Sequence, residues 1–133
     1  MNTSLTAVSA STSTKLRIAS WVLQLIAAAA FLAAGTAKLA GVPMMVGIFD
    51  QIGIGQWFRI ATGLVEIAGA LALLAPASAA FGGLLLAITM LFGIATHIFI
   101  IGGNPTPAIV LLLITSAIAY LRRQSITRLL KRS

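Results

Sequence analysis

The chain has no cysteine, only two acidic side chains and a single histidine among its 133 residues. Without cysteine it cannot form a disulfide, a thiol nucleophile, a cysteine-ligated zinc site or an iron–sulfur cluster. One histidine excludes a haem held by two histidines of the same chain, and no flavin-binding pattern is present. We therefore expect no metal site and no tightly bound redox cofactor.

Charged residues are also scarce. Only 8% of the residues are charged, whereas a soluble domain carries about 25%. The apolar share is 59%, and the mean hydropathy is +1.07. Residues 67–121 include no Asp, Glu, Lys or Arg, and an uncharged stretch of this length fits only a lipid bilayer. The sequence therefore predicts an integral membrane protein.

The apolar runs predict an all-α fold, a bundle of four transmembrane helices within residues 15–123. The predicted helices cover residues 17–39, 56–75, 77–101 and 105–121. Only the short sequence "APASA" separates the second run from the third. Residues 1–14 are rich in Ser, Thr and Ala without a periodic pattern, which predicts disorder, and residues 124–133 form a basic tail.

A short amphipathic helix is predicted between the first two spans, over residues 43–52. Its apolar side chains recur at helical spacing after Pro43, with Asp50 and Gln51 on the other face. Such a helix lies in the membrane interface. Gly53 and Gly55 then end it and turn the chain into the next span.

The basic residues predict the orientation. Lys15 and Arg17 precede the first span, five more cations follow the last one, and the loops contain almost none. The positive-inside rule then places both termini in the cytoplasm and the protein in the inner (cytoplasmic) membrane. We interpret the net charge of +7 as contact with anionic lipids of the inner leaflet rather than with nucleic acid.

Three ionisable side chains are predicted to meet in the outer half of the bilayer. Helical side chains lean toward the N-terminus of their own helix, so Lys38 and His97 reach inward and Glu66 reaches outward. The three converge if their helices are neighbours. Arg59 and Thr62 share the face of Glu66, and Thr96 lies beside His97.

This cluster has structural as well as functional interpretations. An intramembrane carboxylate is costly and therefore faces the bundle with a partner, but a Lys38–Glu66 pair can simply fix helix order. Lys38 could instead extend to the surface, and Arg59 is expected to reach lipid phosphates in that way. For His97 alone, contact with interfacial water or a loop carbonyl is the plainer interpretation.

The order of motifs along the chain resembles that of DoxX-like small membrane proteins. The matching segments are "FLAAGTAKLAG", "IFDQIGIGQWFRIATGLVEIAGALALLAP", "ITMLFGIATHIF" and "AIAYLRR". The resemblance covers about residues 16–123. It carries the family pattern onto Gly35, Lys38 and Leu39, onto Gly63, Glu66 and Gly69, and onto Thr96 and His97.

The resemblance implies a link to redox systems, because name-giving members resemble a membrane subunit of a thiosulfate:quinone oxidoreductase and others are associated with thiol redox complexes. We do not expect this chain to be an oxidoreductase alone. One hypothesis is a membrane subunit that holds a quinone beside Lys38, Glu66 and His97, with a redox protein partner or as a homo-oligomer. The alternatives are a small proton-coupled transporter and a membrane scaffold without chemistry.

Overall fold

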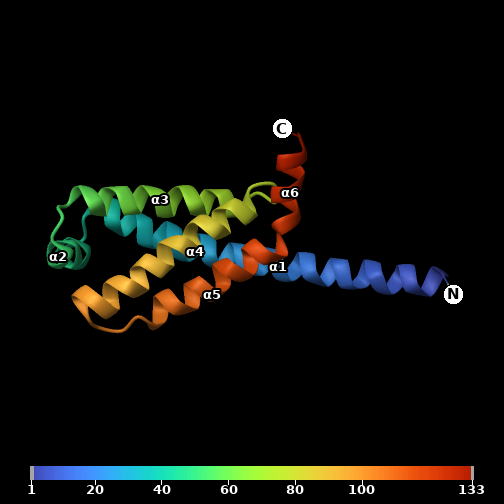
Figure 1. The fold of residues 1–133 in the computed structure, drawn as a ribbon, viewed down its shortest axis with the longest axis horizontal. Coiled ribbons are helices and arrows are strands. Elements are labelled where there is room, and N and C mark those ends of the chain that lie inside the picture. Colours follow the sequence, from blue (N-terminus) through green and yellow to red (C-terminus); the bar gives the residue numbers. More distant parts are fainter. Residues whose placement is uncertain (1, 133) are drawn as a thin grey trace.

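The computed structural model describes residues 2–132, and every regular element in that range is a helix (Figure 1). The elements are α1 (Asn2–Ala40), α2 (Pro43–Ile52), α3 (Trp57–Leu73), α4 (Ala79–Thr96), the π-helical turn η1 (His97–Ile101), α5 (Thr106–Leu121) and α6 (Arg123–Arg132). The predicted all-α class is confirmed for this range. The helix predicted over residues 43–52 is α2, with the same bounds.

Four long helices form a closed bundle. α1 packs on α3, α3 on α4 and α4 on α5, and α5 returns to α1. Short connections make successive helices antiparallel, so α2 lies at one end of the bundle and α6 at the other (Figure 1). The core combines alanines with larger apolar side chains from all four helices, and Phe31, Leu73, Leu86 and Ile118 are the largest apolar side chains that are fully buried.

The outside of the bundle is apolar, as expected of a surface that faces lipid. Phe92 and Phe99 are 71% and 82% exposed, and many leucines and isoleucines of the long helices are also exposed. Two segments, Ser13–Ala40 and Ala79–Ile101, are long and apolar enough to cross a membrane. α3 has 17 residues and α5 has 16, which corresponds to about 25 Å each at ~1.5 Å per residue.

The helix ends differ from the predicted ones in two places. The turn between α3 and α4 extends from Leu74 to Ser78, because the Ser78 hydroxyl donates to the Ala72 carbonyl at 2.8 Å and thereby ends α3. The second difference is at the N-terminus, where α1 begins at Asn2 and projects beyond the bundle (Figure 1). A disordered segment was predicted there, but residues 2–34 contain neither proline nor glycine to interrupt a helix that continues into the first span.

Candidate functional site

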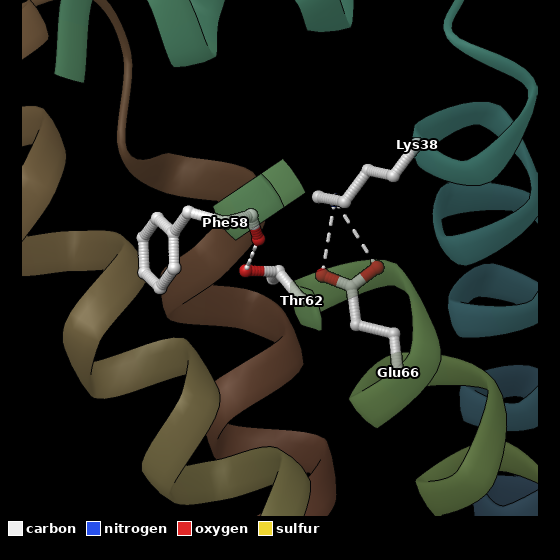
Figure 2. A network of polar contacts seen from close by, with 4 residues as sticks. All are labelled: Lys38, Phe58, Thr62 and Glu66. Carbon is white, nitrogen blue, oxygen red and sulfur yellow. Dashed lines mark hydrogen bonds and ion pairs between the residues drawn. The ribbon is translucent and has the colours of Figure 1, made fainter. Parts of the chain in front are cut away.

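The Lys38–Glu66 ion pair is the centre of the site. The Lys38 ammonium lies 3.0 Å from Oε1 and 3.1 Å from Oε2 of Glu66. The two side chains point toward one another from α1 and α3 (Figure 2). Only 13% of the lysine side chain and 3% of the glutamate side chain are exposed. The structure therefore brings these two residues together, and Lys38 does not extend to the surface.

Two glycines set the distance between the helices that carry this pair. A Cβ atom added to Gly35 would lie 2.7 Å from Ile67 Cγ1 and 2.9 Å from the Gly63 carbonyl oxygen. A Cβ atom on Gly63 would lie 3.1 Å from the Gly35 carbonyl oxygen and from Lys38 Cβ. Each glycine thus faces the other helix where α1 and α3 are closest, as small residues do at membrane helix contacts.

Arg59 has a different position from the predicted one. Its guanidinium donates to the Lys38 carbonyl oxygen, and its Nε donates to Gln56 Oε1 at 2.7 Å. These two contacts are with protein atoms, whereas the sequence analysis expected Arg59 to reach lipid phosphates. The Lys38 carbonyl, in the last turn of α1, also accepts from the Gly41 amide at 3.2 Å, and a cation is favourable at this end of a helix dipole. Arg59 supports the backbone of Lys38 and does not line the cavity described next.

An apolar cavity of about 490 Å³ adjoins the ion pair. Its walls come from the long helices and from α2, with Phe31, Phe49, Phe58 and Met90 among them. Every predicted site residue except Arg59 is in its lining, namely Lys38, Thr62, Glu66, Thr96 and His97, and Thr89 is a further polar residue there. The structure thus brings His97 to the same cavity as the ion pair.

The three threonines of this cavity present oxygen atoms as acceptors. The hydroxyl groups of Thr62, Thr89 and Thr96 each donate to the carbonyl four residues earlier, at 2.8 Å. Figure 2 shows this bond between Thr62 and Phe58. Because a hydroxyl has one proton and two lone pairs, each oxygen retains the capacity to accept a hydrogen bond. Thr89 was not among the predicted residues.

His97 is held by the turn that follows it. Its Nδ1 lies 2.9 Å from the Gly102 carbonyl oxygen, and the Gly102 amide donates to the His97 carbonyl at 2.8 Å. A carbonyl oxygen only accepts, so Nδ1 carries a proton in this contact, and in the neutral ring Nε2 is then an acceptor. Gly102 adopts a φ of 68°, which glycine tolerates without strain. The π-helical turn therefore fixes the orientation of the ring.

Gln24 is a buried polar residue outside the predicted site. It is fully buried in the bundle, where it donates to the Leu73 carbonyl at 2.7 Å and accepts from Arg122 Nε at 2.8 Å. A lone glutamine in an uncharged run was the available signal. Its partners lie 49 and 98 residues away, so the sequence did not reveal them.

The arrangement favours a neutral, largely apolar molecule with one polar end. The two formal charges beside the cavity are paired and cancel, the walls are hydrocarbon, and the remaining polar groups are acceptors or exchange protons. Among the described residues, no group of three His, Asp or Glu side chains lies close enough to hold a metal ion.

Comparison with known proteins identifies the family. The model of the DoxX-like family matches residues 22–121, which is most of the chain and includes the ion pair and the cavity. The chain belongs to the DoxX-like family. No curated protein and no solved structure matched this DoxX-like protein. It is therefore a member of a membrane-associated family with apolar helices long enough to cross a bilayer.

Proposed function

We propose that this DoxX-like protein is the quinone-binding membrane subunit or partner of a redox system linked to thiol or sulfur chemistry. The observation that carries the proposal is the apolar cavity of about 490 Å³ with Lys38, Glu66 and His97 in its lining. Ligand cavities of about 300–1,000 Å³ with mostly apolar walls and a few polar groups are typical of small-molecule sites. A quinone has the matching shape, with a flat ring, two carbonyl oxygens and an apolar tail.

The polar residues have distinct roles in this proposal. Lys38 stabilises negative charge on a quinone oxygen during reduction. Glu66 and Nε2 of His97 are acceptors in the resting site, so they take up the two protons from water and relay them to the quinone, which becomes a quinol. The two electrons come from a redox protein partner, because the chain has no cysteine and no flavin- or haem-binding pattern of its own.

The membrane arrangement is part of the same proposal. All four helices α1, α3, α4 and α5 cross the inner membrane, with α2 at the outer interface and both termini in the cytoplasm. The closed order of these helices in the bundle supports it. α3 and α5 are about 25 Å long at ~1.5 Å per residue, so flanking residues complete their spans. The cavity then opens to the outer half of the bilayer, where quinones dissolve.

A cavity-filling variant provides the test. Gly93 lines the cavity, and a Cβ atom at this position would meet nothing within 4 Å. Gly93→Leu therefore adds a side chain to the cavity without a clash at Cβ. Gly47 has equally open surroundings outside the cavity lining, so Gly47→Leu is the matched control.

Two measurements are made on the detergent-solubilised protein. Thermal unfolding with and without a short-chain quinone measures stabilisation by the quinone, and mass spectrometry of co-purified lipids detects quinone that the protein retains. We expect wild type and Gly47→Leu to retain quinone and to be stabilised by it, and Gly93→Leu to do neither. A wild-type protein that purifies without quinone and is not stabilised by added quinone would contradict the proposal.

Proton-coupled transport is the alternative. The pairing of Glu66 with Lys38 argues against it for cationic substrates, because the carboxylate that would bind such a substrate is already neutralised. Uptake into vesicles that depends on a pH gradient and on Glu66, without added quinone, would favour the transporter.

A further inference from the structure

A second cavity, of about 360 Å³, lies where α5 passes into α6. It is lined by the α3–α4 turn, including Pro76 and Ala77, and by Arg122, Gln124, Ser125 and Arg128. α6 crosses the end of the bundle beside this turn (Figure 1). This end of the molecule is opposite the Lys38–Glu66 pair and has no part in the proposed quinone site.

The cations at this end have no acidic side chain to pair with. The whole chain contains only Asp50 and Glu66. Glu66 is paired with Lys38, and Asp50 accepts from Gln56 at 2.8 Å near α2. The positive charge beside the second cavity must therefore be balanced by something other than a carboxylate side chain of this protein.

The Arg122 guanidinium is held in place next to this cavity. Its Nε donates to Gln24 Oε1 at 2.8 Å, and its central carbon lies 5.7 Å from the centre of the Trp21 ring. Gln24 is fixed in turn by its bond to the Leu73 carbonyl. Because these contacts orient the planar guanidinium in advance, little conformational freedom is lost when it binds a ligand.

One nitrogen of this guanidinium remains unsatisfied. Arg122 Nη2 is buried and has no hydrogen-bond partner among the described residues. Buried charged donors normally have partners. Burial lowers the pKa of Arg122, and the nearby charge of Arg17 lowers it further. Arginine stays protonated nonetheless, so this position keeps a positive charge that is partly desolvated and repelled by Arg17.

We infer that this cavity binds a phosphate group. Arg122 lines the cavity and offers the guanidinium donors that Gln24 leaves free for charge-assisted hydrogen bonds to phosphate oxygens. Arg128 adds a second positive charge, and Gln124 adds an amide donor. The phosphate can be the headgroup of an acidic phospholipid or a free phosphate ion. The chemistry is the same for both, and Pro76, Ala77 and Leu121 add apolar surface that fits a lipid.

Two charge-matched variants in α6 test this inference. Arg128 is exposed and lines the cavity, whereas Arg123 stacks on Tyr120 with its guanidinium carbon 4.1 Å from the ring centre and is absent from the lining. Arg128→Gln and Arg123→Gln each remove one positive charge. Ala77 is exposed and lines the cavity. Ala77→Phe therefore fills the cavity and leaves the charge unchanged.

Affinity is measured with the full-length protein in two ways at constant ionic strength. Inorganic phosphate is titrated against the protein in neutral detergent, with chloride as the control anion. Phosphatidylglycerol is titrated in phosphatidylcholine nanodiscs. We expect one or both ligands to bind wild type, and Arg128→Gln and Ala77→Phe to weaken binding about tenfold, as for the loss of one charge-assisted hydrogen bond. Arg123→Gln should stay within about twofold of wild type.

The outcomes separate the possibilities. Binding of phosphate in detergent assigns the site to the free ion, and binding of phosphatidylglycerol alone assigns it to a lipid headgroup. Equal losses in Arg128→Gln and Arg123→Gln, with none in Ala77→Phe, would mean diffuse attraction to the basic tail and would overturn the inference. The absence of binding to wild type in both assays would overturn it as well. None of these results depends on quinone binding.

Discussion

The Lys38–Glu66 pair is the residue-scale feature on which the site depends. An ammonium and a carboxylate that are 13% and 3% exposed have lost most of their solvation. Their mutual attraction and the double contact at 3.0 and 3.1 Å offset that loss. Each charge is therefore tolerable only while the other is present.

We predict strong coupling between these two residues. Lys38→Met or Glu66→Gln alone should destabilise the protein by about 3–5 kcal/mol, because each leaves a buried charge or polar group without its partner. The double variant should recover most of that loss. Thermal unfolding of the four proteins in detergent measures the cycle, and losses that add within about 0.5 kcal/mol would show that the pair is not coupled.

The stable double variant also separates a structural role from a binding role. If it binds short-chain quinone as tightly as wild type, the pair only holds α1 against α3. If it is stable but does not bind quinone, the pair takes part in recognition as well.

At the scale of the element, the main feature is the close packing of α1 against α3. Gly35 and Gly63 allow the backbones of α1 and α3 to come close enough for Lys38 to reach Glu66. Close backbone approach gives van der Waals contact, which is the main attraction between helices in a membrane because lipid is as apolar as the side chains.

We predict that Gly35→Ala destabilises the bundle by about 1–3 kcal/mol through overpacking, because its Cβ would lie 2.9 Å from a backbone oxygen of α3. Gly93→Ala is the matched control in α4, since its Cβ meets nothing within 4 Å, and it should stay within about 0.5 kcal/mol of wild type. Thermal unfolding in detergent measures both. Equal stability of the two variants would show that α1 and α3 are not closely packed at Gly35.

The end of α1 is a second element-scale feature. We predict that Arg59→Gln loosens residues 38–42, because the Lys38 carbonyl loses its guanidinium donor, at a cost of about 1–2 kcal/mol. Amide hydrogen exchange should rise locally in this segment. Unchanged exchange at residues 38–42 would mean that Arg59 contributes nothing to the end of α1 and reaches lipid phosphates instead.

At the scale of the whole molecule, the positive charges are concentrated at one end of the bundle. Seven of the nine cations lie in residues 15–17 and 122–132, at the two ends of the chain, and α6 and the N-terminus lie at the same end of the bundle (Figure 1). An even number of spans is consistent with that placement.

We predict that reporters fused to either terminus are active only on the cytoplasmic side. A reporter inserted between Gly53 and Gly55, in the turn after α2, should be active only on the outer side. A C-terminal reporter that is active outside, with the N-terminal one inside, would contradict four spans and leave an odd number.

The sequence by itself determined the membrane class, the helical content and the approximate helix ends. An uncharged stretch as long as residues 67–121 is favourable only in a lipid bilayer. A backbone inside the bilayer has no water to bond to and must satisfy its own hydrogen bonds, which favours helices. Apolar residues at helical spacing between Pro43 and Gly53 also predicted α2. The lean of helical side chains toward their own N-terminus predicted that Lys38, Glu66 and His97 converge.

Only the tertiary structure decided what each polar face meets. Periodicity assigns a side chain to a face of its helix but does not say which helix packs there, so the sequence left open whether Lys38 reaches Glu66 or the surface. The contact of Arg59 with the Lys38 carbonyl, the contact of Gln24 with Arg122 and the shape of both cavities depend on the order in which four helices close into a bundle. That order is set by packing between residues far apart in the chain, and no local pattern records it.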